Sequence, residues 1–191
     1  MTIRTIDKTY KGEYKSSQSR FLSYLMPTKT ISGFKEQLLQ LKKEYPKASH
    51  ICYAYRIGFE NEEIRAHDDG EPSGSAGKPI LNQLYSSQLQ NVSLFVVRYY
   101  GGTKLGIPGL IEAYKEAAIQ CLQQAEIIED EEEYFLTLQL ETFKYYEVIK
   151  ALKNNNINIL NSDFTTGKYM VKISLPRSKK QWLEMILSSY S

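Results

Sequence analysis

The sequence predicts an α+β protein with two domains, residues 1–131 and 132–191. Strand-like runs of alternating apolar residues are interspersed with helix-spaced apolar stripes along the chain. The acidic segment "IIEDEEEY" (127–134) breaks this pattern and marks the boundary. After it, the segments follow the order strand, helix, strand, strand, helix. This order predicts a small ferredoxin-like second domain, one strand short of the complete unit.

Strands of the first domain are predicted where apolar residues alternate or run together. Residues 10–15 and 19–27 predict two strands around a Ser-Ser-Gln turn, and residues 50–58 predict a third. The polar residues 59–64 that follow are expected to form a turn. The run "NVSLFVVRYYGG" (91–102) is almost continuously apolar, which predicts a central, buried strand.

Helices of the first domain are predicted from apolar stripes and the residues that flank them. Ser32 is the expected N-cap of a helix that ends near Tyr45, before Pro46. A short helix is expected to begin near Ile80, and Pro108 marks the first residue of another helix. In the second domain, residues 134–140, 156–160 and 169–175 predict strands, and apolar stripes over 145–152 and 182–190 predict helices.

The composition is that of a soluble globular protein, with 42% hydrophobic and 24% charged residues. No apolar run approaches the ~20 residues of a membrane span, and the N-terminus lacks the apolar core of a signal peptide. Cys52 and Cys121 lie in apolar surroundings without metal-binding spacing, which predicts buried free thiols in a reducing compartment. We therefore expect a cytoplasmic protein without a membrane partner.

The net charge of +2 is too small to indicate nucleic-acid binding by itself. Its distribution is uneven, since residues 1–134 carry 16 basic and 18 acidic side chains and residues 135–191 carry 8 and 4. A solvated face is the commoner explanation for such a basic tail, and a surface that faces phosphate is the alternative.

The stretch "DDGEPSGSAGKPIL" (68–81) places three carboxylates and three glycines directly before a predicted helix. We name residues 68–77 the acidic glycine loop. It is not a P-loop, because Pro72 and Pro79 occupy the positions of the first glycine and the hydroxyl residue. A nucleophile elbow is also disfavoured, since Ser73 stands where that turn requires glycine.

Two interpretations of the acidic glycine loop stay open. His67, Asp68, Asp69 and Glu71, with His50, are candidate ligands for a divalent metal ion, although their spacing is not diagnostic. Alternatively, the carboxylates accept hydrogen bonds from the N–H groups of the loop and cap the following helix. We favour this structural interpretation and expect no bound metal and no cofactor.

A second glycine-rich run, "RYYGGTK", forms residues 98–104, which we name the basic glycine loop. Arg98 shares a strand face with Val92, Leu94 and Val96, and it is expected to pair with one of the three carboxylates. Lys104 lies just before a helix N-terminus, where free amides favour an anion. We predict that both loops border one binding cleft formed by Asp68, Asp69, Gly70, Glu71, Ser73, Gly77, Arg98, Tyr99, Tyr100, Gly101, Gly102 and Lys104.

The two glycine loops together carry a family resemblance. The segment "VVRYYGGTKLGIPGL" resembles the signature of the Impact/YigZ family, and "AHDDGEPSGSAGKPIL" resembles the family's Asp-Gly-Glu-Pro block. The resemblance covers about residues 15–125, and residues after 133 resemble the small C-terminal domain of bacterial YigZ proteins. It implies a ribosomal protein S5 domain 2-like first domain, with helices on one side of its sheet, and an elongation factor G-like second domain.

The resemblance also implies a function, because eukaryotic relatives are translation regulators that act through protein partners. We therefore expect a non-enzymatic translation factor that binds RNA, the ribosome or a translation protein. The expected nucleic-acid contacts in the second domain are Lys168, Lys172, Arg177, Lys179 and Lys180. The alternatives are a pure interaction module, or a metal-assisted hydrolase in line with a peptidase label used for some relatives. Two histidines are few for a dinuclear peptidase.

Overall fold

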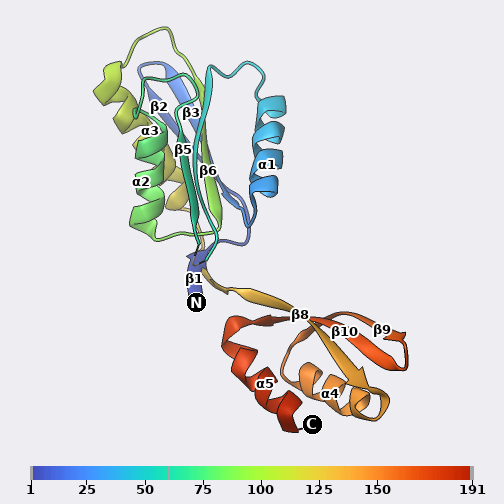
Figure 1. Cartoon of the computed structure of the whole chain (residues 1–191). Coiled ribbons are helices and arrows are strands. Elements are labelled where there is room, and N and C mark those ends of the chain that lie inside the picture. The colour runs from blue at the N-terminus through green and yellow to red at the C-terminus, as the bar shows by residue number, and fades with distance from the viewer. Residues whose placement is uncertain (1, 60, 190–191) are drawn as a thin grey trace. The chain divides into compact units, whose positions relative to one another are not determined.

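The computed structural model describes residues 2–59 and 61–189. These residues divide into two compact units, Ile3–Asp130 and residues 131–189 with Thr2. Within the described residues, no helix is long and apolar enough to cross a membrane. Each unit combines helices with an antiparallel sheet, in agreement with the predicted mixture of helix and strand (Figure 1).

The sheet of the first unit has the strand order β2-β3-β6-β4-β5. Every neighbouring pair is antiparallel. Its strands are β2 (Tyr10–Ser16), β3 (Ser19–Pro27), β4 (His50–Ile57), β5 (Glu63–His67) and β6 (Val92–Tyr99). The apolar run predicted as a buried central strand is β6, which is buried over Val92–Arg98 and pairs on both sides. That prediction is confirmed.

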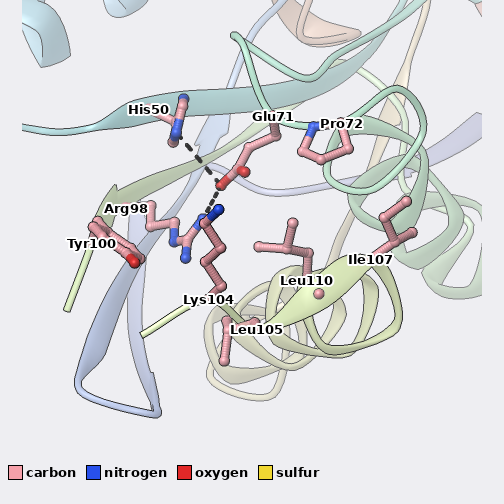
Figure 2. Close-up of a pocket in the computed structure, with 10 residues that line it drawn as sticks. His50, Glu71, Pro72, Arg98, Tyr100, Lys104, Leu105, Ile107 and Leu110 are labelled. Atoms are coloured by element: carbon pink, nitrogen blue, oxygen red, sulfur yellow. Dashed lines mark hydrogen bonds and ion pairs between the residues drawn. The ribbon is translucent and has the colours of Figure 1, made fainter. Parts of the chain in front are cut away.

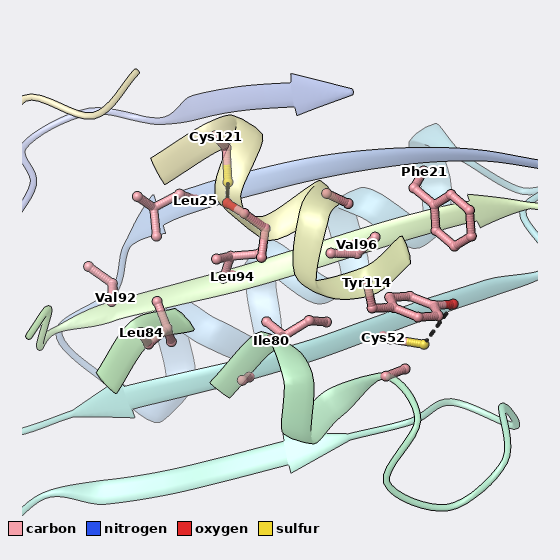
Figure 3. Close-up of a cluster of buried hydrophobic side chains, with 14 of the residues drawn as sticks. Phe21, Leu25, Cys52, Ile80, Leu84, Val92, Leu94, Val96, Tyr114 and Cys121 are labelled. Atoms are coloured by element: carbon pink, nitrogen blue, oxygen red, sulfur yellow. Dashed lines mark hydrogen bonds between the residues drawn. The ribbon is translucent and has the colours of Figure 1, made fainter. Parts of the chain in front are cut away.

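Helices cover both faces of this sheet, which corrects the expectation of helices on one side (Figure 1). The helices α2 (Gly77–Ser87) and α3 (Gly106–Leu122) pack on one face, whereas α1 (Ile31–Glu44) packs on the other. Figure 3 shows the first core, in which Leu94 and Val96 of β6 face α2 and α3. The intervening β6 residues Phe95 and Val97 pack under α1. Because β6 has apolar side chains on both faces, helices pack on both faces of the sheet and remove those side chains from water.

Several element boundaries differ from the predictions. The N-cap of α1 is Thr30 and not Ser32, because the Thr30 hydroxyl accepts a hydrogen bond from Gly33 N at 3.1 Å. The helix α3 begins at Gly106, so Pro108 is its third residue instead of its first. The segment expected to be a turn contains the start of β5, which pairs with β4. The short strands β1 (Thr2–Thr5) and β7 (Ile128–Glu131) form a two-stranded sheet that the sequence patterns did not predict.

The second unit has the predicted order of elements, and Tyr190 of the last predicted stripe lies outside the described residues. They are β8 (Glu133–Glu141), α4 (Thr142–Asn154), β9 (Asn158–Thr165), β10 (Lys168–Pro176), the short 3-10 helix η1 (Arg177–Lys179) and α5 (Lys180–Ser189). The strand order is β8-β10-β9. Leu138, Val171 and Ile173 of the sheet share a core with Val148 of α4 and Leu183 of α5.

Candidate functional site

Asp68 organises the acidic glycine loop. Its Oδ1 accepts hydrogen bonds from Ala76 N at 3.0 Å and Gly77 N at 2.8 Å, and its Oδ2 accepts one from Gly74 N at 2.9 Å. Burial alone would raise the pKa of this carboxyl, but the three backbone hydrogen bonds outweigh that effect and lower it. Asp68 therefore closes the loop on itself and caps α2, as the structural interpretation expected.

The other two carboxylates of the loop also have protein partners. Asp69 Oδ2 accepts a hydrogen bond from Ile51 N at 2.7 Å, and its carbonyl oxygen accepts one from His50 Nδ1 at 2.8 Å. Glu71 Oε1 lies 2.5 Å from Arg98 Nη1, which identifies Glu71 as the carboxylate that pairs with Arg98. Both side chains are almost buried, at 5% exposure for Arg98 and 4% for Glu71.

A buried polar network continues from this ion pair. The Tyr114 hydroxyl donates to Glu71 Oε1 at 2.8 Å, and the Cys52 thiol donates to that hydroxyl at 3.3 Å. Burial, together with the nearby Glu71 carboxylate, raises the pKa of both Tyr114 and Cys52. Cys52 and Cys121 are both buried and unbridged, as predicted, and burial raises the pKa of Cys121 to about 11. These thiols are protonated and poorly nucleophilic near neutral pH.

The basic glycine loop is held in place near its start by contacts of Gly101, whereas Gly102 and Lys104 towards its end are exposed. Gly101 N donates to Ser19 Oγ at 3.1 Å, and a Cβ atom at Gly101 would lie 2.1 Å from the Gln18 carbonyl carbon. Only glycine permits this close approach of two backbones. A Cβ atom at Gly102 would meet nothing within 4 Å, and Lys104 is exposed. Over the described ranges, Lys104 makes no ion pair.

The two loops meet at a cleft of about 470 Å³ (Figure 2). Glu71 and Pro72 of the acidic glycine loop border one side, and Arg98, Tyr100 and Lys104 of the basic glycine loop border the other. The remaining wall comes from β4 and the start of α3, through His50, Leu105, Gly106, Ile107 and Leu110. The cleft is thus lined by two cationic side chains, Arg98 and Lys104, and by the Glu71 carboxylate, next to an apolar wall.

The other residues expected at the cleft lie elsewhere in the two loops. Asp68, Asp69, Gly70, Ser73, Gly77, Gly101 and Gly102 are not among its lining residues. Gly77 packs so tightly on β5 that a Cβ atom there would lie 2.5 Å from His67 N. Tyr99 packs under α1, whereas Tyr100 is 47% exposed and its ring centroid lies 5.5 Å from Arg98 Cζ.

Sequence patterns did not assign His50, Pro72, Leu105, Ile107 and Leu110 to the cleft. A signal for two of them was present, because Leu105 and Ile107 flank Gly106 at the start of a helix that follows Lys104. Ile107 is 54% exposed, although it is a large apolar residue. Large apolar side chains that are exposed next to one another mark candidate interaction surfaces, whereas single ones do not.

The basic residues expected to contact nucleic acid in the second unit are largely engaged by the protein. Lys168 Nζ lies 2.8 Å from Glu141 Oε1, and Arg177 Nη1 lies 2.9 Å from Glu132 Oε2. Lys179 donates to the Asn155 carbonyl oxygen at 2.5 Å. Lys172 is exposed on β10, and Lys180 Nζ lies 5.4 Å from the centroid of the Tyr134 ring. These residues do not form one uncompensated cationic surface.

The three carboxylates of the acidic glycine loop, which were candidate metal ligands, each form hydrogen bonds with different groups of the protein. Asp68 accepts three hydrogen bonds from backbone N–H groups, Asp69 accepts one from Ile51 N, and Glu71 is paired with Arg98 and Tyr114. Among residues 2–59 and 61–189, no group of three or more histidine, cysteine or acidic side chains has a metal-binding arrangement. A cation held by all three carboxylates would compete with these hydrogen bonds, because both oxygens of Asp68 already accept backbone N–H groups.

These observations define a two-unit protein of mixed helix and sheet, with a cleft between two glycine loops of its first unit. Residues 17–122 match the family model described as the Impact N-terminal domain. The chain is 32% identical over 176 residues to the IMPACT family member YigZ of Escherichia coli, covering 91% of this chain and 86% of that protein. It is 33% identical over 161 residues to an IMPACT family member of Haemophilus influenzae, covering 83% and 78% of the two chains. The chain belongs to the IMPACT family.

A solved crystal structure, described as a hypothetical protein, has a similar fold. It matches with a TM-score of 0.80 and 30% sequence identity, over 100% of this chain and 93% of that one. The arrangement of elements in this chain is therefore shared by a protein of known structure.

Proposed function

We propose that the protein is a translation-associated regulatory factor that binds a partner at the cleft and does not act as an enzyme. Membership of the IMPACT family supports the link to translation, since the family resemblance implies translation regulators among its eukaryotic members. One observation supports the choice of the cleft as the binding site. Lys104 projects beside the cleft without an ion-pair partner in the described chain, close to the buried Arg98.

The cleft suits an anionic group attached to an apolar or planar one. α3 is 17 residues long, and within the described residues no side chain caps its N-terminus at Leu105. Its first amides and Lys104 together favour a phosphate or carboxylate. Tyr100 and the apolar residues of α3 offer a surface on which a base or an apolar side chain packs. Such a group belongs to RNA, to the ribosome or to a protein partner.

A metal-assisted hydrolase has less support. Each carboxylate of the acidic glycine loop accepts hydrogen bonds from groups that fix the fold, and Glu71 is paired with a buried arginine. A general base needs a carboxylate or imidazole that is available to its substrate. The imidazole that lines the cleft is His50, whose Nδ1 lies 2.8 Å from the Asp69 carbonyl oxygen and whose Nε2 lies 3.9 Å from Glu71 Oε1. The arrangement favours a structural role for these residues.

We further propose the finer classification of the two units. The first is ribosomal protein S5 domain 2-like, and the second, from residue 132, is ferredoxin-like and elongation factor G-like. The order β8-β10-β9, with α4 between β8 and β9, supports the second assignment, because the first strands of a split β-α-β unit have this order. A role in translation also implies a cytoplasmic location.

The test is binding to purified ribosomes and to a transfer RNA over a salt series from 50 to 300 mM. If phosphate is the ligand, affinity falls steeply with salt, and Lys104→Glu weakens binding several-fold. Lys35→Glu is the matched control, since Lys35 is exposed on α1 at the opposite face of the sheet. Absence of binding at low salt, or equal effects of the two variants, contradicts binding of RNA at the cleft.

A further inference from the structure

A second hollow of about 320 Å³ lies beside the cleft, between α2 and α3. The acidic glycine loop borders both hollows, since Pro72 lines the cleft and Gly74 lines the second hollow. α3 also borders both, through Ile107 in the cleft and Ile111 one helical turn further on. Figure 2 shows Pro72 and Ile107 at the same end of the cleft. We name the second hollow the helix groove, and its lining includes Lys78, Pro79 and Asn82 of α2 and Ile111 and Lys115 of α3.

Ile107 and Ile111 form a pair of exposed apolar side chains on α3. They are 54% and 39% exposed. Residues four apart on a helix lie on one face, with Cβ atoms about 6 Å apart. The stripe of α3 that packs in the core is a different one, which contains Leu110, Ala113 and Tyr114. Because the two exposed isoleucines are neighbours, they mark a candidate interaction surface that joins the cleft to the helix groove.

The charges at both hollows favour an acidic ligand. Lys78 borders the helix groove and Lys104 borders the cleft; both are exposed, and neither forms an ion pair within the described chain. Lys115, the other cation of the helix groove, is already compensated by two glutamates of α3. Among the described residues, Glu71 is the one carboxylate that lines either hollow, and it is paired with Arg98. An acidic segment would therefore gain two cationic contacts and meet no unpaired carboxylate in the lining.

The kind of apolar surface favours a protein segment over RNA. Unstacked bases of single-stranded RNA pack on aromatic rings or on arginine planes. Tyr100 offers such a ring in the cleft, but no aromatic side chain of the described residues lines the helix groove. Aliphatic surface such as that of Ile107 and Ile111 is covered instead by the apolar side chains of an amphipathic segment.

The acidic segment of the chain itself, residues 129–133, is a poor candidate for this role in a second copy. Asp130 Oδ2 lies 2.8 Å from Lys29 Nζ, and Glu132 Oε2 lies 2.9 Å from Arg177 Nη1. These carboxylates would have to leave their partners before they could reach another molecule. The charges therefore favour a different protein as the occupant.

We propose that the cleft and the helix groove together bind one acidic, amphipathic helix of a partner protein, an extension that rests on the proposed binding at the cleft. Two apolar side chains of this helix, four residues apart, pack against Ile107 and Ile111. Carboxylates that flank the two apolar side chains contact Lys104 and Lys78. The apolar pair supplies the packing, and the two lysines select the charge of the partner.

The test selects ligands for the full chain from a phage-displayed library of random peptides of about fourteen residues, or four helical turns. We expect the enriched sequences to carry a net negative charge and apolar residues at positions i and i+4. Fluorescence anisotropy of a selected peptide, labelled with fluorescein, then measures its Kd for each variant of the chain. Neutral or basic sequences, or a lack of enrichment, overturn the proposal.

Substitutions in the helix groove locate the selected peptide. Lys78→Glu and Ile111→Ser should each raise its Kd at least about fivefold, because one removes a cationic contact and the other removes apolar surface. Lys35→Glu and Leu39→Ser are the matched controls, since both residues are exposed on α1 at the opposite face of the sheet. These controls should leave the Kd unchanged. Equal effects of the groove and control substitutions overturn the proposal.

Lys104→Glu separates this extension from the proposed function. If Lys104→Glu raises the Kd but Lys78→Glu and Ile111→Ser do not, the ligand occupies the cleft alone, and only the helix groove is lost. If none of the three raises it, both proposals fail for this ligand. Transfer RNA binding that is weakened by both lysine variants but not by Ile111→Ser would identify RNA as the occupant and overturn the proposal. A dimeric chain that the peptide dissociates would identify a second copy instead.

Discussion

The acidic and the basic glycine loop border the same cleft but differ in how the protein uses their polar side chains. In the acidic glycine loop, the side chains of Asp68, Asp69 and Glu71 all accept hydrogen bonds: Asp68 from amides of the loop itself, Asp69 from Ile51 N and Glu71 from the Tyr114 hydroxyl. In the basic glycine loop, Arg98 is paired, whereas Lys104 is exposed and has no ion-pair partner in the described part of the chain.

This difference predicts which substitutions lower the stability of the protein and which lower its affinity for a ligand. A side chain that satisfies buried groups costs free energy of folding when it is removed. An exposed side chain without a partner can be removed at little cost, and its loss is felt by a ligand. We therefore expect substitutions in the acidic glycine loop and at Arg98 to lower stability, and those at Lys104 to lower binding.

The largest effect is expected for Arg98→Ala. It leaves the Glu71 carboxylate buried and without its cationic partner, so the free energy of unfolding should fall by about 3 kcal/mol. Urea denaturation at pH 7 measures it. The double variant Arg98→Met with Glu71→Gln removes both charges and should be less destabilised than Arg98→Ala. A loss below about 1 kcal/mol for Arg98→Ala would show that water replaces the ion pair.

A smaller effect is expected at the two glycines of the basic glycine loop, and it should differ between them. Gly101→Ala places a Cβ atom 2.1 Å from the Gln18 backbone, so it should destabilise the protein by about 2 kcal/mol. At Gly102 the space is free and φ is +89°, so Gly102→Ala should cost only the backbone strain, about 1 kcal/mol. Thermal unfolding of both variants measures the difference. Equal costs would mean that the close contact with Gln18 relaxes easily.

The pH dependence of stability should identify Asp68. Its folded-state pKa is lowered, so its stabilising contribution is present above the unfolded-state pKa of about 3.9 and is lost as the pH falls through the folded-state pKa. Asp68→Asn should cost about 1.5 kcal/mol at pH 7, because a charged acceptor of three N–H groups becomes neutral. Urea denaturation from pH 7 to pH 3 should show this difference shrinking below about pH 4. A difference that is constant with pH would contradict the assignment.

The sequence predicted the features of this site that follow from local patterns, but it did not predict which residues pair across long distances in the chain. The burial of the apolar run "VSLFVV" (92–97) followed from its composition, and the meeting of the two loops followed from strands and helices that end beside them. The choice of Glu71 over Asp68 or Asp69 as the partner of Arg98 did not follow. All three lie within four residues, and only the packed positions of β6 and α3 bring Glu71 to Arg98 and Tyr114.

The misjudged elements have similar causes. Thr30 and Ser32 are both good N-caps two residues apart, and local sequence does not distinguish them. The strand β5 is almost entirely exposed, so it has no apolar periodicity, and its pairing with β4 defines it. The position of α1 on the second face depended on reading both faces of β6 as apolar, whereas the family resemblance implied helices on one face.

The smallest stability effect is expected for Lys104→Ala. The side chain is exposed at the mouth of the cleft, and in the described residues it forms no ion pair, so the free energy of unfolding should stay within about 0.5 kcal/mol of wild type. Loss of one phosphate contact should instead reduce the slope of log affinity against log salt by about one. Urea denaturation and the ribosome-binding salt series, run on the same preparation, measure the two quantities. Unfolding of this variant, or an unchanged salt slope despite wild-type stability, would remove Lys104 from the binding site and leave the basic glycine loop as a structural element like its acidic neighbour.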